Sequence, residues 1–292
     1  MKRRCLEFCL RAVAPQTLPV EMRHLRTSPW SGQAAAESAL KVIASCLPLR
    51  GSVRRMHILT WNCNGALRNK LDALATLQFD IAIIQECEDP DRSNSLSYKT
   101  WAKNHLWTGK NKNKGIGVFA APGVKLSPVD LELGQLESFL PCRINDSFLL
   151  VASWTRQANS PTFQYIGQLW KFIQAHHGVL STQSTVIAGD LNSNVRWDKW
   201  DRWWNHSDVV RELSAMGLES VYHRSRGIPQ GSEPEPTFFM QRNPAKAYHI
   251  DYAFAPVAWL DECSAWVGDS DKWLQWSDHM PLVVRVDLPD DA

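Results

Sequence analysis

Residues 184–194, STVIAGDLNSN, join a short apolar run to a dense polar end. The run at 184–188 has the length and the β-branched content of a buried strand. It leads directly into Gly189, Asp190 and Asn192. A carboxylate beside a buried strand is costly to desolvate unless it is paired or binds a cation. Turn chemistry around Gly189 explains either polar residue alone, so the other strand ends must be considered with it.

Four more apolar runs are bordered by polar side chains of the same kind. They carry Asn62 and Asn64, Gln85 and Glu86, Asp251 and Tyr252, and Ser277, Asp278 and His279. A single Asn in such a place is usually a turn residue, and a single carboxylate usually belongs to a loop or a helix cap. Five such places in one chain favour a shared site instead. Because the ligands are oxygen atoms and no Cys/His set indicates zinc, the site suits Mg²⁺ or Mn²⁺.

Strands and helices alternate around these polar places. Further strands are predicted at 57–61, 80–85, 115–120, 148–154, 237–240, 249–254 and 282–286. Apolar residues at helical spacing predict helices over 67–77, 163–175 and 207–216, the last with Ser207 as its N-cap and Gly217 just beyond its end. One domain of strands with interspersed helices is the economical interpretation.

The chain has 292 residues, of which 44% are hydrophobic and 21% are charged, as in an ordinary globular protein. No run approaches the ~18 apolar residues of a membrane span, so we expect no membrane partner. Seven cysteines without a repeated close spacing indicate free thiols in a reducing compartment, and we therefore expect a cytoplasmic protein. We also expect a monomer, since nothing in the sequence indicates a protein partner.

The formal net charge of +2 conceals an uneven distribution. Residues 1–55 hold ten Lys/Arg and three Glu, a net charge of +7, while the other 237 residues hold 22 basic and 27 acidic side chains, a net charge of −5. We predict a basic N-terminal extension at 1–55, disordered or partly helical, and a domain at 56–292 that carries the chemistry. Removal of the extension is expected to leave fold and activity intact.

The composition of the extension, rich in arginine and poor in acids, has three interpretations. It is typical of an organelle transit peptide, of a flexible tail, or of upstream sequence translated from a wrongly chosen start. Met56 immediately precedes the first convincing strand, which favours the last interpretation.

Five motifs carry a resemblance to a known family: TWNCNG at 60–65, IIQE at 83–86, GDLNSN at 189–194, HIDYAF at 249–254 and WSDHMPL at 276–282. In this order and at this spacing the chain resembles the endonuclease/exonuclease/phosphatase superfamily, the fold of deoxyribonuclease I and exonuclease III. The resemblance covers about residues 56–288. It implies an α+β fold, a four-layer α/β/β/α sandwich in which two mixed β-sheets pack face to face between flanking helices, with one active site at the rim.

The resemblance also implies a metal site and a catalytic group. Glu86 matches the principal metal-binding carboxylate, with Asn62 beside it and Asp278 as a further carboxylate near the metal, which we expect to be Mg²⁺ or Mn²⁺. In the catalytic group, each motif residue again matches one role. Asp190 matches the aspartate that orients or deprotonates the attacking water, and Asn192 matches the amide that holds a phosphate oxygen. Asp251 and His279 match the pair in which a carboxylate orients an imidazole. A protonated imidazole can stabilise the charge of the transition state.

One position departs from the family pattern. The family places His or Tyr at the end of the strand at 148–154, whereas this sequence has Trp154, whose indole N–H donates a hydrogen bond but transfers no proton. Either this contact is donor-only here, or Arg156 or another group replaces it. We predict that Trp154 and Arg156, together with Asn64 and Trp197, contact the substrate.

Two further stretches bear on the substrate. Residues 197–204, WDKWDRWW, interleave aromatic and basic side chains that can stack bases and hold a backbone, or they form an amphipathic turn whose tryptophans pack inward. Lys110, Lys112 and Lys114 belong either to a hairpin that touches phosphates or to an ordinary solvated loop. The net charge of −5 argues against a broad nucleic-acid-binding face, but it allows a narrow basic groove beside a metal.

The sequence therefore predicts a Mg²⁺- or Mn²⁺-dependent phosphoesterase, a nuclease that cleaves DNA or RNA by in-line attack of water. Inositol phosphates and phospholipid head groups are alternative substrates on the same fold. A non-catalytic binding module is the alternative from a different class. Loss of ligand residues would favour that alternative, and nearly all of them are present.

Overall fold

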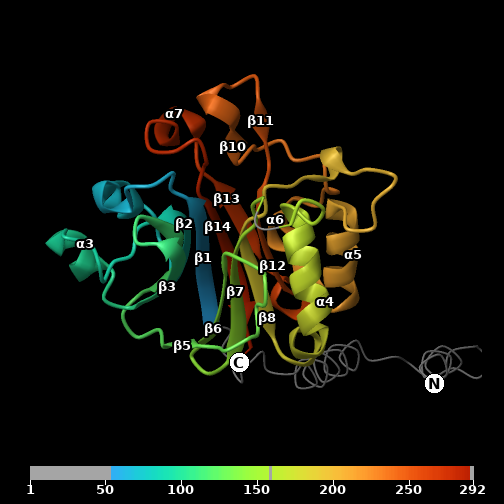
Figure 1. Cartoon of the computed structure of the whole chain (residues 1–292), viewed down its shortest axis with the longest axis horizontal. Helices are drawn as coiled ribbons and strands as arrows, with labels where there is room; N and C mark the ends of the chain where they lie inside the picture. Colours follow the sequence, from blue (N-terminus) through green and yellow to red (C-terminus); the bar gives the residue numbers. More distant parts are fainter. Residues whose placement is uncertain (1–53, 158–159, 290–292) are drawn as a thin grey trace, which may run out of the picture. The chain divides into compact units, whose positions relative to one another are not determined.

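The computed structural model describes residues 54–157 and 160–289. Two six-stranded β-sheets pack face to face, and helices flank them (Figure 1). This arrangement confirms the predicted α+β sandwich of two mixed sheets. Residues 1–53 of the predicted extension lie outside the described part, whereas Arg54 and Arg55 already belong to the first strand.

The first sheet has the strand order β13-β14-β1-β2-β4-β3. Its strands are β1 (Arg54–Asn62), β2 (Ile81–Cys87), β3 (His105–Asn111), β4 (Lys114–Ala120), β13 (Ser264–Val267) and β14 (Leu282–Leu288). β1 runs parallel to β2 and antiparallel to β14, so the sheet is mixed. The apolar run predicted at 80–85 forms β2, which is buried along nearly its whole length because both of its faces are covered.

The second sheet has the order β5-β6-β7-β8-β12-β9. Its strands are β5 (Leu126–Pro128), β6 (Phe139–Ile144), β7 (Phe148–Trp154), β8 (Thr185–Asp190), β9 (Leu218–Ser220) and β12 (Asp251–Pro256). β7 runs parallel to β8, and β12 runs antiparallel to it. A two-stranded sheet of β10 (Phe238–Phe239) and β11 (Ala247–Tyr248) stands apart from both.

Most helices in the described part are short. The α-helices are α2 (Leu71–Leu74), α3 (Leu96–Trp101), α4 (Ile166–Thr182), α5 (His206–Ala215), α6 (Val221–Arg226) and α7 (Ser270–Trp273), and the 3-10 helices are η1 (Leu67–Asn69), η2 (Val195–Trp197), η3 (Met240–Arg242) and η4 (Val257–Trp259). None of these described helices combines the length and the hydropathy that a membrane crossing requires.

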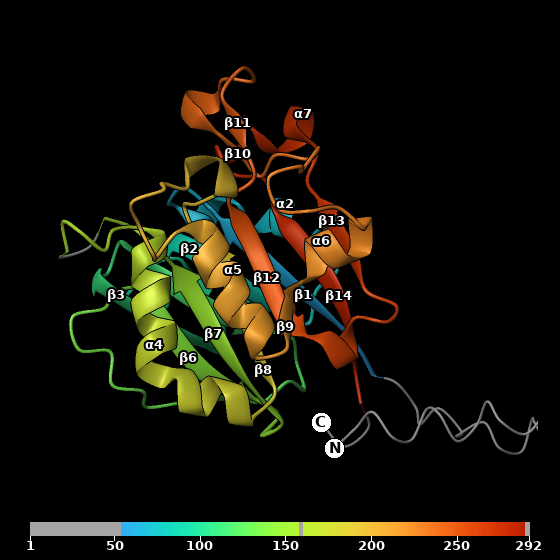
Figure 2. The ribbon, with the colours of Figure 1, turned by 90° about the vertical axis from the view of Figure 1, so that its right-hand side faces the viewer.

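The side chains of β7 alternate between two hydrophobic clusters. Phe148 and Leu150 lie in the cluster between the two sheets. Leu149 and Val151 lie in a second cluster with α4 and α5, which cover the outer face of the second sheet (Figure 2). Because successive side chains of a strand point to opposite faces, a strand covered on both sides buries every residue, as β7 does.

The predicted continuous helix over 67–77 is wrong. The segment forms η1 and α2, which Lys70 separates with a non-helical φ of −125°. The Glu88 carboxylate accepts the main-chain N–H groups of Leu67 and Arg68, and the Lys70 ammonium donates to the main-chain oxygens of Cys63 and Trp276. These tertiary contacts hold the two short helices and Lys70 in place.

Several other boundaries differ from the prediction, and the strand predicted at 249–254 is β12, which runs from Asp251 to Pro256. α4 begins at Ile166 rather than at 163 and continues past a bend at His176 to Thr182. Only Phe238–Phe239 of the strand predicted at 237–240 is extended and paired. The N-cap of α5 is Asn205 and not Ser207, because the Asp198 carboxylate accepts the N–H groups of both His206 and Ser207. Gly217 follows the end of α5 with a φ of +78°, as predicted.

The polar strand ends meet at one end of the sandwich. Asn62 lies opposite Gln85 where the parallel strands β1 and β2 end. Trp154, Asp190 and Asp251 lie in one row across the second sheet, because β7 and β12 flank β8. Residues far apart in the sequence are thus brought to one place.

Candidate active site

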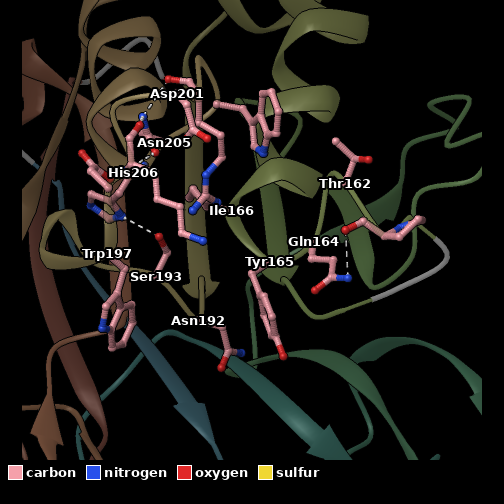
Figure 3. Close-up of a pocket in the computed structure, with 15 residues that line it drawn as sticks. Thr162, Gln164, Tyr165, Ile166, Asn192, Ser193, Trp197, Asp201, Asn205 and His206 are labelled. Carbon is pink, nitrogen blue, oxygen red and sulfur yellow. Dashed lines mark hydrogen bonds between the residues drawn. The ribbon is translucent and has the colours of Figure 1, made fainter.

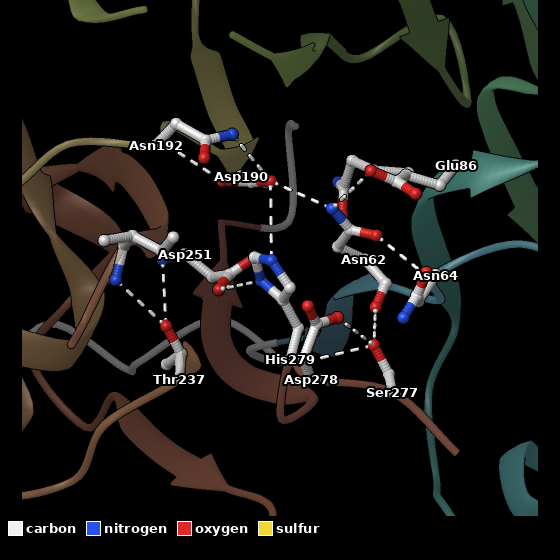
Figure 4. Close-up of polar contacts among 12 residues, drawn as sticks. Asn62, Asn64, Glu86, Asp190, Asn192, Thr237, Asp251, Ser277, Asp278 and His279 are labelled. Atoms are coloured by element: carbon white, nitrogen blue, oxygen red, sulfur yellow. Dashed lines mark hydrogen bonds and ion pairs between the residues drawn. The ribbon is translucent and has the colours of Figure 1, made fainter. Parts of the chain in front are cut away.

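Asp190 is the centre of a polar cluster between the two sheets (Figure 4). Its side chain is fully buried, and three N–H groups bind its carboxylate. The main chain of Asn192 donates to Oδ1 at 2.9 Å, and the side-chain amides of Asn192 and Asn62 donate to Oδ2 at 2.9 and 3.0 Å. These bonds hold the carboxylate in one orientation.

His279 lies between two carboxylates. Its Nδ1–H donates to Asp251 Oδ2 at 2.9 Å, which directs Nε2 toward Asp190 Oδ2 at 3.9 Å. The N–H groups of Ile250 and Asp251 donate to Thr237 Oγ1 at 3.0 and 3.1 Å, so a threonine from a neighbouring loop positions the strand end. Oδ1 of Asp251 is buried and has no hydrogen-bond partner among the described residues.

The electrostatics of this pair suit acid–base work. Burial raises the pKa of Asp190, and His279 lowers it, with a net increase because the nearby Asp251 carboxylate adds to the effect of burial. Burial lowers the pKa of His279, but the carboxylates of Asp251 and Asp190 outweigh burial and raise it. The imidazole therefore stays protonated near neutral pH, beside a carboxylate that is readier than usual to accept a proton.

Glu86 faces the same cluster from the other sheet. It has a φ of +62° at a register shift between Gln85 and Cys87, a β-bulge that turns its side chain out of the strand alternation. Its Oε1 lies 3.4 Å from Asn62 Nδ2, and its Oε2 lies 2.8 Å from the ammonium of Lys114. Gln85, by contrast, is fully buried and donates to Thr60.

The residues predicted to hold a metal surround this bulge. The Nδ2 of Asn62 donates to the carboxylates of Glu86 and Asp190, and its Oδ1 accepts the main-chain N–H of Asn64. Binding of a cation by Oδ1 would therefore require the amide to turn. Asp278 is half-buried, with Oδ1 3.4 Å from the Ser277 hydroxyl that donates to the main chain of Asn62. Glu86, Asn62 and Asp278 together offer oxygen atoms and no sulfur, which is the donor set of a hard cation.

Two groups of side chains in the described residues bring three His, Cys or carboxylate ligand atoms within 4.8 Å of one another. One is Asp190, Asp251 and His279, whose members are already hydrogen-bonded or paired as above. The other is Asp89, Asp91 and His105, in which Asp89 pairs with Arg92 at 2.6 Å. Neither group contains Glu86, the carboxylate that the sequence motifs single out for the metal.

Both N–H groups of the Asn192 side-chain amide already have partners. Its Nδ2 uses its two N–H groups on Asp190 Oδ2 and on the main-chain oxygen of Thr155, each at 2.9 Å. To hold a phosphate oxygen, as predicted, the amide must release one of these partners.

The four residues predicted to contact substrate lie in different environments. Trp154 is only 5% exposed, and the cations of Lys114 and Arg156 lie 5.6 and 4.7 Å from its ring centroid. Arg156 also pairs with Glu137 at 2.9 Å. Asn64 is exposed, and Trp197 lines an open pocket that also contains Asn192.

Sequence reasoning missed two residues of the cluster. Thr237 has no sequence signal beyond its place before a short strand, so only the fold identifies it. Lys114 belongs to the Lys/Asn stretch whose role the sequence left open. The structure places that stretch at the β3–β4 hairpin, with Lys114 on Glu86 and Lys110 on Glu137 at 2.6 Å.

No known family model and no curated protein matches the sequence. Solved structures nevertheless share its fold. The 3′-5′ exonuclease NExo from Neisseria meningitidis is similar with a TM-score of 0.58 and 18% identity, over 80% of this chain and 100% of that one. An AP endonuclease from Archaeoglobus fulgidus is similar with a TM-score of 0.57 and 18% identity, over 80% of this chain and 99% of that one. TDP2 from Caenorhabditis elegans is similar with a TM-score of 0.57 and 12% identity, over 89% of this chain and 82% of that one.

At these identities the likeness establishes the fold alone. It confirms the deoxyribonuclease I-like sandwich that the five sequence motifs implied. The roles of individual side chains must be argued from the chain's own geometry.

Proposed function

We propose that this chain is a divalent-metal-dependent phosphodiesterase, a nuclease that cleaves DNA or RNA. The observation that carries the proposal is the convergence of Asp190 and the His279–Asp251 pair with Glu86 around the amide of Asn62. Hydrolysis of a phosphodiester needs an activated water, charge neutralisation at the non-bridging oxygens and help for the leaving oxygen. Asp190 is suited to the first need, and His279 together with a bound cation is suited to the second. The similar structures support the proposal, since one of them is a 3′ phosphatase bound to a DNA hairpin.

Asp190 is the proposed base. Its three N–H partners direct the carboxylate, and its raised pKa lets it accept a proton from water at neutral pH. His279, held by Asp251, is the proposed cation that stabilises negative charge on the phosphoryl oxygens. The paired Nδ1 leaves Nε2 as the nitrogen that faces the reaction.

Glu86, Asn62 and Asp278 are the residues proposed to hold the cation, and their donor set fits Mg²⁺ or Mn²⁺. When bound, such a cation neutralises phosphate charge and lowers the pKa of water. Lys114 balances the charge of Glu86 and is half-exposed, so its ammonium can turn to a phosphate.

The free thiols support the expected cytoplasmic location. Cys63, Cys87, Cys142 and Cys263 are unpaired in the described part of the chain. Burial raises the pKa of Cys63 and Cys142 to about 12, so these thiols stay protonated and unreactive. This pattern is typical of proteins in a reducing compartment.

A substrate panel tests the proposal. The full chain is incubated with single-stranded, double-stranded and abasic DNA, RNA, inositol phosphates and bis-p-nitrophenyl phosphate, in Mg²⁺, Mn²⁺ or EDTA. We expect metal-dependent cleavage of a nucleic acid, reduced about 100-fold or more in Asp190→Asn and His279→Ala. Glu86→Gln should weaken Mn²⁺ binding in titration calorimetry.

Matched controls are Asp72→Asn and His177→Ala, because both side chains are exposed on helices outside the cluster. They should retain full activity. Absence of metal-dependent cleavage of every substrate, or full activity in both active-site variants, would refute the enzyme. Cleavage confined to inositol phosphates would refute the nuclease and favour a phosphatase on the same fold.

A further inference from the structure

A pocket of about 610 Å³ opens beside the catalytic cluster (Figure 3). Residues 161–166 before α4 form one wall, and residues 192–206 between β8 and α5 form the rest. Asn192 lines this pocket and also donates to Asp190, so the pocket is continuous with the proposed reaction centre. Figure 3 shows the side chains of Tyr165 and Trp197 on either side of Asn192.

Tyr165 is held in an unusual conformation at the pocket wall. Its φ of +52° and ψ of −118° are unfavourable for a residue with a side chain, and its N–H donates to the main-chain oxygen of Arg156 at 2.8 Å. The residue is nevertheless 41% exposed. Such strain persists where the surrounding structure enforces it, and it is concentrated at binding sites.

Trp197 supplies a second open aromatic face. It is 42% exposed and packs against Tyr248, with ring centroids 5.0 Å apart. Of the other tryptophans in the stretch 197–204, Trp200 is 98% exposed and Trp203 is exposed too, while Trp204 alone is buried. The interpretation in which these tryptophans all pack inward is therefore wrong, and a loop that keeps three indoles in water favours a binding surface.

The same loop brings positive charge to the pocket. Lys199 and Arg202 line it, and neither has an ion-pair partner among the residues that the structure describes. The carboxylate of Asp198 is engaged with the N–H groups of His206 and Ser207 at 2.9 and 3.2 Å. Asp201 also lines the pocket, so the two carboxylates balance the two cations in formal charge, and Lys199 and Arg202 remain as the cations without an ion-pair partner.

The loop is organised by its own hydrogen bonds and packing. The side-chain oxygen of Asn205 accepts the main-chain N–H of Lys199, and its side-chain nitrogen donates to the main-chain oxygens of Lys199 and Arg202, at 2.8 to 2.9 Å. Trp204 packs on Phe163 with ring centroids 4.6 Å apart, which anchors the loop to the segment before α4. The aromatic and basic side chains thus stand on a fixed frame, which lowers the entropy cost of binding.

We propose that this pocket binds an unpaired nucleotide next to the phosphate that is cleaved, an inference that rests on the proposed nuclease function. The base lies against Tyr165 and Trp197, and Lys199 and Arg202 hold the adjoining phosphate. The volume is within the usual range for a small-ligand site. A base inside a duplex has both faces covered by its neighbours, so only an unpaired base can stack on these rings. The chain therefore prefers single-stranded nucleic acid, or a single-stranded end, to a continuous duplex.

The direct test is binding without catalysis. Fluorescence anisotropy with labelled single-stranded dT and rU oligonucleotides, and with a duplex of the same length, is measured for the full chain in EDTA. We expect tighter binding of a single strand, and Trp197→Ala and Tyr165→Ala each to weaken it about 10-fold. Trp266→Ala is the matched control, because Trp266 is 43% exposed on β13 and lies outside the pocket.

Variants that change charge or keep an aromatic ring test the pocket even if the alanine variants misfold. Lys199→Gln with Arg202→Gln changes only exposed or partly exposed side chains, and it should lower the slope of log Kd against log salt by about 1.4. Trp197→Phe and Tyr165→Phe keep a stacking face, so they should restore most of the binding lost in the alanine variants.

The outcomes separate this inference from the proposed function. Equal binding by Trp197→Ala, Tyr165→Ala and Trp266→Ala would overturn the pocket, as would wild-type binding to duplex that is as tight as to a single strand. Failure of the wild type to hydrolyse bis-p-nitrophenyl phosphate and every oligonucleotide would overturn the nuclease instead. With an active enzyme, KM for a single-stranded oligonucleotide should rise about 10-fold more in Trp197→Ala than KM for bis-p-nitrophenyl phosphate.

Discussion

Gly189 shows how a residue without a side chain places the carboxylate that we propose as the base. A Cβ at this position would lie 1.7 Å from the main-chain oxygen of Ser153 on the neighbouring strand β7. We predict that Gly189→Ala lowers the free energy of unfolding by about 3 kcal/mol, because the backbone of β7 cannot give way without moving Asp190. Urea denaturation measures the change.

Gly178→Ala provides the control at the same scale. Gly178 lies in α4, and its Cβ would meet nothing within 4 Å. Alanine in an open helical position should be neutral or stabilise the protein by up to about 1 kcal/mol. Equal losses in both variants would contradict the argument from close approach.

The residue types of the proposed catalytic group are predictable from the sequence, but their contacts with one another are not. Asp190 and Asp251 stand beside apolar runs in the sequence, so the cost of burying their carboxylates follows from the local pattern alone. Their pairing in one row depends on β12 running beside β8, and Thr237 enters only because its loop crosses that row. Sequence separation hides such contacts, since no local pattern records them.

At the scale of elements, α5 shows how a loop residue adds to the cap of a helix. Ser207 has the right residue type for an N-cap, but the helix begins one residue earlier. Asp198, from the preceding loop, accepts the N–H groups of His206 and Ser207, and the negative charge also suits the N-terminal end of the helix dipole. Asp198 therefore adds a cap from the loop to the local one, in which the Asp208 carboxylate accepts the N–H of Asn205 at 2.8 Å.

We predict that Asp198→Ala lowers the free energy of unfolding by about 1 to 2 kcal/mol, because it leaves helix donors without partners. Ser207→Ala should cost clearly less, since it removes a hydroxyl and leaves both main-chain bonds to Asp198. Thermal and urea unfolding of the two variants compare the costs. A larger loss in Ser207→Ala would restore Ser207 as the dominant cap.

At the scale of the whole molecule, buried histidine makes stability depend on pH. His206 is almost fully buried, between Ser193 and Gln230, and burial lowers its pKa from 6.5 to about 4. Below pH 6.5 the unfolded chain binds a proton that the folded chain does not bind until about pH 4. Stability that is present above pH 6.5 is therefore lost as the pH falls through this window, by roughly 3 kcal/mol from this residue.

His206→Gln tests the pH prediction, because glutamine keeps a polar side chain but does not titrate. The difference in unfolding free energy between wild type and variant, from urea curves across the same pH window, should shrink as the pH is lowered. A constant difference would show that His206 does not carry the effect.

By itself the sequence determined the class of fold and the chemistry of its strand ends. Strand periodicity, buried apolar runs and the cost of isolated carboxylates are local properties, so residues 184–194 and four similar places indicated one oxygen-rich site on a sandwich. The sequence did not predict the break in the segment at 67–77 or the contact of Asp198 with α5, because each depends on a carboxylate outside the segment concerned.

Only the tertiary structure decided which polar side chains share the site and which aromatic faces stay open. A bulge turns Glu86 toward Asn62, two cations cover Trp154, and Trp204 alone of its stretch is buried. No sequence pattern indicated Tyr165 as a binding residue. It lines the pocket together with a loop that lies 27 or more residues further along the chain. Contacts of this kind depend on how distant segments pack against each other, and a local sequence pattern does not show that packing.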